Sequence, residues 1–438
     1  MVRPFRIAIL AVLALILVSC TGDSQSSTST TTSSGGGETT TSSTLPGETT
    51  TTTAPPLDLT ELPGTEALPQ EVRDELVELV QITQEVRRLN FLEPPLISVV
   101  SDDELEALVR EQIEEEAEDL PIDEALYELL GLLDGSTDLE TLLIDLYGEQ
   151  VAGFYDGETG EMVVPITTEG FSEVQRATLV HELAHSLTDQ HFDFHTAYQA
   201  MFDEQRYDVA SAYQALIEGD ASFTEVQYLQ TLSQEALGRF FAEALQVGTE
   251  QLEAAPQFIQ DSLIFPYDTG LSFVQTLHGE GGWQAVNEAY RRLVDLPGST
   301  EQVITPDDYG RDLPRDVSLP AIEIPGYELY ESSVWGELGL RIIFDEVLAD
   351  DDVLTAADGW GGDAYGVWYD GSNVVFVLVY EGDTQTDRDE AEEALLQFAR
   401  NSVPEPAFVW VEVINDTLTF IASDVPTVGE TIRDDLKG

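Results

Sequence analysis

Val180-His181-Glu182-Leu183-Ala184-His185-Ser186 places two histidines four residues apart, with a glutamate directly after the first. On an α-helix, residues four apart lie on the same face, one turn above the other. Two imidazoles in this arrangement can bind one metal ion, and the adjacent carboxylate can reach a water molecule on that ion. This H-E-x-x-H pattern is typical of zinc metallopeptidases. The chain has five histidines, and four of them lie between positions 181 and 195.

The residues around the motif predict the helix that the motif needs. Ser172, with Gln175 three residues later, forms a capping-box pattern. Apolar residues then recur at helical spacing and mark a buried stripe: Val174, Ala177, Val180, Leu183, Ala184 and Leu187. The sequence therefore predicts a capped amphipathic helix that carries both histidines on one face.

A catalytic zinc ion needs three protein ligands and one open position, so a third ligand must come from elsewhere. Glu218 is the candidate we favour, because in the gluzincin class a glutamate on a following helix completes the site. Its separation of 33 residues from His185 leaves room for a loop and a returning helix. Asp220 is then a candidate for a residue that orients one of the histidines.

His191 is the alternative third ligand. His181, His185 and His191 have the one, five, eleven spacing of the metzincin pattern H-E-x-x-H-x-x-G-x-x-H. However, Thr188 stands where that pattern has glycine, and a β-branched residue resists the positive φ that such a turn often needs. If the helix simply continues, six residues rotate His191 by about 240° from His185, away from the metal.

Glu182 is the predicted general base with either third ligand. One Zn²⁺ would lower the pKa of a bound water to about 7, and the carboxylate would accept its proton and return it to the leaving amine. The oxyanion needs a second electrophile. Tyr267, His278 and Tyr309 are candidates, but spacing cannot choose among them, and each also fits a structural role.

A β-hairpin is predicted just upstream of the motif. Val151–Tyr155 and Glu161–Val164 are rich in β-forming residues, and Asp156-Gly157-Glu158-Thr159-Gly160 joins them. A free strand edge beside a zinc-binding helix could pair with an extended peptide substrate. A purely structural hairpin fits the same residues.

The charge of the chain limits the classes of partner. With 84 acidic and 18 basic residues the formal net charge is −66. Such a surface repels nucleic acid and anionic lipid headgroups, so neither is expected as a partner. The hydrophobic fraction of 42% suffices for a globular core, and an acidic secreted or salt-adapted protein accounts for the charge.

The N-terminus has the pattern of an export signal. Arg3 and Arg6 precede the apolar run Ile7–Val18, which is too short for a comfortable membrane span. Leu17-Val18-Ser19-Cys20 resembles a bacterial lipobox, and Cys20 is the only cysteine. We therefore expect a signal peptide over residues 1–20 and a lipid anchor at Cys20 facing outside the cytoplasm, as the sole membrane contact. Secretion after ordinary signal cleavage and an uncleaved anchor are the alternatives.

The remaining chain divides into three segments. Residues 21–60 are mainly Ser, Thr, Gly and Pro and predict a flexible tether. Residues 61–325 are mostly helical with a small β-sheet, and we expect helix breaks at Gly219–Ser222 and at Phe265-Pro266-Tyr267. Residues 332–438 predict a small α+β domain with strands at 364–369 and 374–380 and a hairpin around Asn415-Asp416. The predicted fold class is thus α+β.

The segment His181–Phe192 resembles a little-described family of bacterial zinc metallopeptidase-like lipoproteins and secreted proteins. The resemblance extends over most of the chain after the tether, through residues 152–156 and 215–221, Phe265-Pro266-Tyr267, Gly281-Gly282-Trp283, residues 299–303 and residues 359–363. It implies a zincin-like, metal-dependent peptidase acting on a peptide or protein, with His181, Glu182, His185 and Glu218 as site residues. Similar proteins have His-Pro where Thr305-Pro306 stands here.

Two functions from different classes follow. The first is an exported zinc metallopeptidase that hydrolyses peptide bonds. The second is a catalytically inactive surface lipoprotein that binds a partner and retains the zincin fold. Glu182 favours the first function, because a structural metal site has no need of a base.

Overall fold

The computed structural model describes residues 57–438, apart from 117–118, 151–152, 169 and 296–297. The lipobox with Cys20, most of the predicted tether and Val151 of the predicted hairpin lie outside the described residues. No described helix is both long and apolar enough to cross a membrane.

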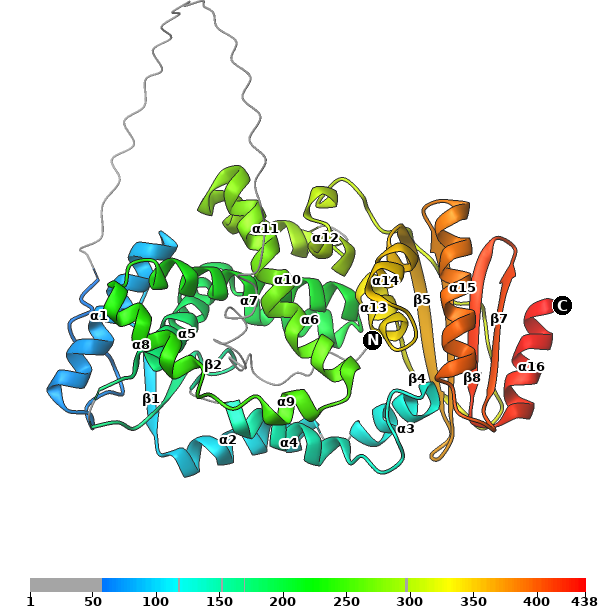
Figure 1. The fold of residues 1–438 in the computed structure, drawn as a ribbon, viewed down its shortest axis with the longest axis horizontal. Helices are drawn as coiled ribbons and strands as arrows, with labels where there is room; N and C mark the ends of the chain where they lie inside the picture. Colours follow the sequence, from blue (N-terminus) through cyan, green and yellow to red (C-terminus); the bar gives the residue numbers. More distant parts are fainter. Residues whose placement is uncertain (1–56, 117–118, 151–152, 169, 296–297) are drawn as a thin grey trace, which may run out of the picture.

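The first part of the described chain is mostly helical (Figure 1). Its elements are α1 (Gln70–Arg87), β1 (Leu96–Val100), α2 (Asp102–Glu116), α3 (Leu120–Leu130), α4 (Leu139–Gln150), β2 (Phe154–Asp156), β3 (Glu161–Pro165), α5 (Glu173–Phe192), α6 (Phe194–Asp203), α7 (Tyr207–Leu229), α8 (Gln234–Ala244), α9 (Glu250–Ala254), α10 (Gln257–Gly281), α11 (Trp283–Asp295) and α12 (Thr300–Ile304). The small sheet has the order β1-β3-β2, with β1 parallel and β2 antiparallel to β3. The hairpin β2–β3 is confirmed, and β2 is an edge strand.

The C-terminal part contains the second sheet. Its elements are the 3₁₀ helix η2 (Pro306–Asp308), β4 (Glu328–Ser333), α13 (Gly336–Asp345), α14 (Asp350–Ala357), β5 (Trp360–Tyr369), β6 (Val374–Gly382), α15 (Gln385–Asn401), β7 (Phe408–Ile414), β8 (Thr417–Ser423) and α16 (Pro426–Lys437). The strand order is β4-β5-β6-β8-β7, all antiparallel. The sequence did not predict β4, α14 or α16. Because β4 pairs with β5, this sheet begins before residue 332.

Helix α5 forms as its sequence predicts. The Ser172 side chain accepts a hydrogen bond from the Gln175 N–H, and the Gln175 side chain accepts one from the Ser172 N–H. The helix continues past Thr188, whose hydroxyl bonds back to the carbonyl of Ala184 (2.8 Å). A continuous helix rotates His191 away from His181 and His185.

Two predicted helix breaks are wrong. Helix α7 runs through Gly219, and α10 runs through Pro266. Gly219 serves packing, because a Cβ atom there would lie 2.2 Å from the carbonyl oxygen of Gly270 on α10. A Cβ atom on Gly270 would lie 2.1 Å from the carbonyl oxygen of Ala215. The two glycines therefore let the backbones of α7 and α10 cross closely beside Glu218.

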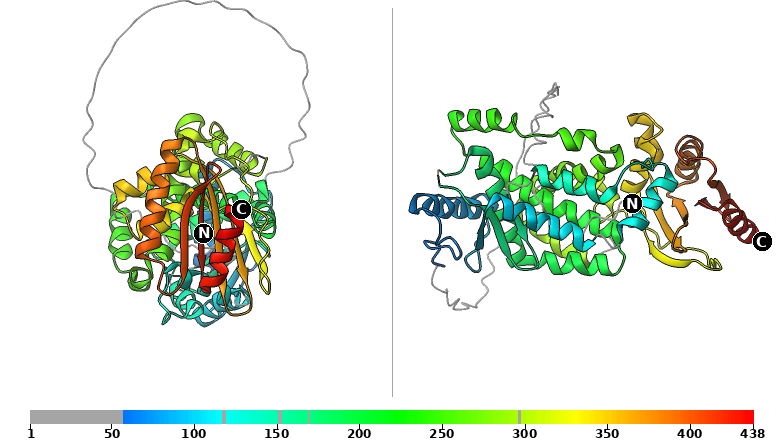
Figure 2. Two further views of the ribbon diagram at one scale, coloured as in Figure 1. Left: turned by 90° about the vertical axis from the view of Figure 1, so that its right-hand side faces the viewer. Right: turned by 90° about the horizontal axis from the view of Figure 1, so that it is seen from below.

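The two parts share one hydrophobic core. A single cluster runs from α2–α4 through α7 and α10 to α13, α15 and one face of the second sheet, which includes Phe376 and Phe420. The opposite face of that sheet packs against α16 through Val377, Ile421 and Ile432. Figures 1 and 2 show the second sheet at one end of an elongated molecule, with α13 and α14 toward the helical part. The fold class is α+β, as predicted.

Candidate metal centre

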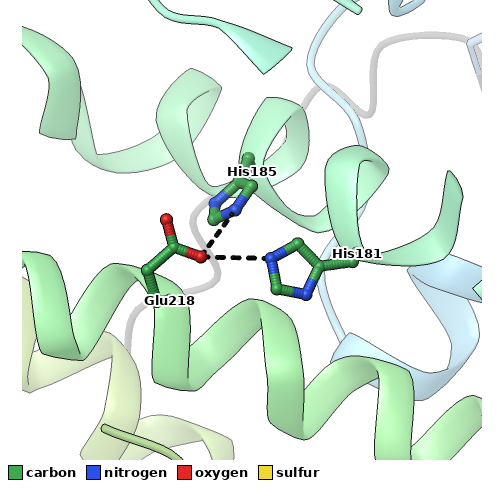
Figure 3. Close-up of side chains that lie close together, drawn as sticks. All are labelled: His181, His185 and Glu218. Carbon is green, nitrogen blue, oxygen red and sulfur yellow. Dashed lines mark hydrogen bonds and ion pairs between the residues drawn. The ribbon is translucent and has the colours of Figure 1, made fainter. Parts of the chain in front are cut away.

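Helices α5 and α7 bring two histidines and one glutamate together. His181 Nε2 lies 3.1 Å from Glu218 Oε2, and His185 Nε2 lies 3.4 Å from the same oxygen. Figure 3 shows the two imidazoles projecting from one helix toward the carboxylate on the other. One donor atom from each of the three residues lies within 4.8 Å of the others, and all three side chains are buried. The favoured set from the sequence is therefore a group that could hold a metal ion.

The donor set and its spacing suit a tetrahedral metal ion, of which zinc is one. Ligand atoms about 2.0–2.1 Å from a tetrahedral zinc ion lie about 3.3 Å apart, close to the two distances to Glu218 Oε2. His185 Nε2 and Glu218 Oε1 are buried without a hydrogen-bond partner among the described residues. Buried polar atoms are normally paired, so an unpaired His185 Nε2 that faces the Glu218 carboxylate is consistent with a bound cation.

Glu182 points toward the edge strand β2. The Tyr155 N–H donates to Glu182 Oε2 (2.7 Å), while Glu182 Oε1 is buried and has no hydrogen-bond partner among the described residues. Tyr155 is itself held by its hydroxyl, which donates to Asp189 Oδ2 (2.8 Å) on α5. One oxygen of Glu182 is thus fixed by the backbone of β2, and the other is available to accept a proton.

Glu225 is a site residue that the sequence analysis missed. Its Oε2 lies 3.6 Å from His181 Nδ1, on the side of the ring opposite Glu218. Glu225 follows Glu218 by seven residues, so the two carboxylates lie on the same face of α7, two turns apart. In the sequence, the seven-residue spacing between Glu218 and Glu225 was the signal that could have identified Glu225 as a site residue. A carboxylate on the far nitrogen of a ligating histidine fixes the ring and raises its basicity.

The pKa values show how strongly these side chains interact. Burial lowers the pKa of His181, but hydrogen bonds to Glu218 and Glu225 outweigh it and raise the value to about 10. Burial prevails at His185 and lowers its pKa. Burial raises the pKa of Glu218, but the nearby His185 and His181 bring it below its usual value. The group therefore favours a positive charge beside Glu218, as a proton or as a metal ion.

Glu182 differs from Glu218 in its electrostatic environment. Burial raises the pKa of Glu182 to about 8, although His181 and the hydrogen bond from Tyr155 act in the opposite direction. A carboxyl with a pKa near neutral is suited to accept and return a proton.

Asp220 supports the site through a buried ion pair. Its Oδ1 lies 2.6 Å from Arg87 Nε, and its Oδ2 accepts hydrogen bonds from Arg87 (2.8 Å) and from the Tyr290 hydroxyl (2.9 Å). Asp220 was expected to orient a histidine, but the contacts of its carboxylate are with Arg87 and Tyr290. It acts on His185 only through its charge, which raises the pKa of that residue slightly against burial.

His191, the alternative third ligand, lies outside the group. Its Nε2 is 2.8 Å from the carbonyl oxygen of Asn90. Among the three oxyanion candidates, Tyr267 stacks on His181 with ring centroids 6.2 Å apart. His278 instead packs against Phe223 and Trp283, and Tyr309 against Phe273. Of these four residues, Tyr267 is the one with a described contact to the candidate metal ligands.

In comparisons with known proteins, a family model matches only the C-terminal part of the chain. Residues 327–424 match the model of a family described as a domain of unknown function (DUF8575). No curated protein and no solved structure matches the chain. The matched segment contains β4 through β8 and excludes His181, His185 and Glu218.

Proposed function

We propose that this chain is an exported, zincin-like zinc metallopeptidase. The observation that carries the proposal is the convergence of His181 Nε2 and His185 Nε2 on one oxygen of Glu218, at 3.1 and 3.4 Å. The intact glutamate of the H-E-x-x-H motif adds a base with one free oxygen. A site that is only structural has no use for that base.

The residues divide the chemistry among them. Bound zinc would act as a Lewis acid and activate water for attack on a peptide carbonyl. Glu182 Oε1 accepts the proton of the attacking water, while Oε2 stays bound to the Tyr155 N–H, and the same carboxyl then donates the proton to the leaving amine. Glu225 holds the ring of His181 from the opposite side.

An extended peptide is the substrate class that suits the surroundings. Strand β2 is an edge strand, and the Tyr155 N–H points away from β3 toward Glu182. A peptide that lies along this edge of β2 would run past the base, while the Tyr155 N–H stays bonded to Glu182. The sequence of residues 1–20 supports export with a lipid anchor at Cys20 as the only membrane contact.

A second function is favoured by one observation. Glu182, His185 and Glu218 are each 0% exposed, and His181 is 3% exposed. A closed site of this kind suits a metal that stabilises an inactive surface or binding lipoprotein. The two functions share the metal and differ in whether a substrate reaches Glu182.

Metal analysis together with one substitution tests the proposal. The purified protein should contain about one zinc ion per chain. Glu182→Gln should retain that zinc and lose peptide cleavage by roughly 10²–10⁴-fold, the typical contribution of general acid–base catalysis. Protein without zinc would contradict both functions. Zinc-loaded wild type that cleaves no peptide in a broad peptide library would leave the inactive lipoprotein as the function.

A further inference from the structure

A second cluster of carboxylates lies where the helical part meets the second sheet. Glu301 is in α12, Asp312 follows η2, and Asp383 follows β6. One carboxylate oxygen from each lies within 4.8 Å of the others. The cluster therefore joins segments that are 71 residues apart in the sequence (383 − 312).

Glu301 distinguishes this cluster from a group of exposed acidic residues, because its side chain is buried. The residue is only 5% exposed. Its carboxylate makes no hydrogen bond or ion pair with any residue in the described part of the chain, and the charges that act on it come from other carboxylates. An unpaired buried carboxylate is costly, and such groups are normally paired or bound to a metal.

The neighbouring residues hold this arrangement in place. The Thr300 hydroxyl donates to Asp208 on α7 (2.5 Å) and accepts from the Leu338 N–H on α13 (3.1 Å), which fixes α12 between the two parts. Gln302 bonds to the carbonyl of Asp312 and accepts from the Gly310 N–H, so it folds the loop 306–312 back onto α12. The position of Asp312 next to Glu301 is therefore built by specific contacts.

The positive charge near the cluster is insufficient to neutralise it. Arg315 Nη2 lies 3.1 Å from Asp383 Oδ1, and the same guanidinium also donates to the carbonyls of Gly382 and Asp383. One guanidinium therefore faces three carboxyl groups, and Asp383 also shares a hydrogen bond with Asp312, which requires a proton on one of the two. In keeping with this, burial and then the charges of Glu337, Asp312 and Asp383 raise the pKa of Glu301 to about 9. A divalent cation would balance the remaining charge.

We propose that Glu301, Asp312 and Asp383 form a calcium site that clips the second sheet to the helical part. All three ligands offer oxygen, which hard cations prefer over nitrogen or sulfur. Calcium accepts oxygen ligands in a flexible geometry that often includes water, which suits ligands drawn from a short helix, a loop and a turn after a strand. Asp312 and Asp383 are only half-buried, so water can complete the coordination sphere and the ion can exchange.

Calcium titration of the full chain tests this site independently of the zinc centre. Protein freed of calcium with EGTA should bind about one Ca²⁺ per chain at neutral pH, measured by calorimetry, and its Tm should rise with the calcium concentration. Glu301→Gln should weaken binding by at least about tenfold, because it removes one charged ligand. The zinc content should stay the same in both proteins.

Two further variants keep the test decisive. Asp307→Asn changes an exposed carboxylate in the same loop and should bind calcium like the wild type. Asp312→Asn removes a half-buried ligand without touching the core, and should lose calcium even if Glu301→Gln folds poorly. Equal loss in Asp307→Asn, or a Tm of the wild type that calcium does not change, would overturn the proposal. The latter result would mean that a shared proton neutralises the cluster.

Discussion

The metal centre and the carboxylate cluster place buried glutamates in two different environments. Glu218 Oε2 lies 3.1 and 3.4 Å from two imidazoles on the neighbouring helix, and the pKa of Glu218 falls below its usual value. Glu301 has only carboxylates around it, and its pKa rises. Burial acts in the same direction on both residues, so the difference comes from the partners. The ligands around each glutamate therefore differ: imidazoles surround Glu218 and carboxylates surround Glu301, and the two sets favour different cations.

The two sites also differ in how the chain builds them. His181, His185 and Glu218 lie on two helices that pack together within the helical part. The carboxylate cluster takes its residues from a short helix, a loop and a turn after a strand. Helical scaffolds hold side chains rigidly, which suits the tetrahedral geometry of zinc. Loops adapt more readily, which suits the flexible geometry of calcium.

The largest expected effect concerns the third ligand of the metal centre. Glu218→Ala should abolish stoichiometric zinc binding, because two imidazoles alone leave the site one ligand short. His191→Ala is the matched control, since His191 bonds to Asn90 away from the site, and it should keep its zinc. Zinc content by mass spectrometry after dialysis distinguishes the two. Retained zinc in Glu218→Ala would mean that Glu218 is not a zinc ligand, and the comparison of Glu218 with Glu301 would no longer hold.

The next effect concerns the buried ion pair between Arg87 and Asp220. Asp220→Ala leaves Arg87 charged, buried and uncompensated, and should lower the free energy of unfolding by about 3–5 kcal/mol. Glu235→Ala removes an exposed partner of Arg239 and should have no measurable effect. Urea denaturation measures both. Equal stability of the two variants would show that the Arg87–Asp220 pair does not stabilise α7.

Glu225 provides a smaller and more specific effect. Glu225→Gln should weaken zinc binding by about 10–100-fold, because the partner that orients His181 becomes neutral. A competition titration with a zinc chelator measures this. Calcium binding at the carboxylate cluster should stay at the wild-type level, which serves as an internal control. Unchanged zinc affinity would mean that Glu218 alone positions the ring.

The smallest effect is a pH dependence at the junction of the two parts. Burial raises the pKa of Asp208 to about 7, against the hydrogen bonds from Thr300. The folded state therefore binds a proton that the unfolded state has already released, so stability falls as pH rises from about 4 toward 7. Between pH 6 and 7 this residue should account for a loss of about 1 kcal/mol.

Asp208→Asn should flatten that slope, because the neutral amide does not titrate. The free energy of unfolding of both proteins, compared at pH 6 and 7, checks it. An identical slope in the wild type and Asp208→Asn would show that another carboxyl causes the dependence.

Local patterns predicted much of the helical part and of the metal centre. The capping box at Ser172, the strand Leu96–Val100 and the hairpin before α5 are present because each depends on residues close in sequence. The grouping of Glu218 with His181 and His185 was also predicted, since Thr188 indicated a helix that carries His191 away. These predictions rested on helical periodicity and turn chemistry, which need no knowledge of distant contacts.

Other features depended on contacts that sequence patterns do not encode. Gly219 and Pro266 are helix breakers by propensity, yet both lie inside helices. At Gly219 the reason is the close packing of α7 on α10. Asp220 was expected beside a histidine, but Arg87, 133 residues away, pairs with it.

By itself, the sequence determined the helix that carries His181, Glu182 and His185, because a side chain's position on a helix follows from its residue number. It also determined the fold class and the separation of a helical part from a second sheet. The tertiary structure alone decided the role of Glu225 behind His181 and the meeting of Glu301, Asp312 and Asp383. Those arrangements arise when separate segments pack into one shared core, and the spacing of residues along a chain carries no direct record of that packing.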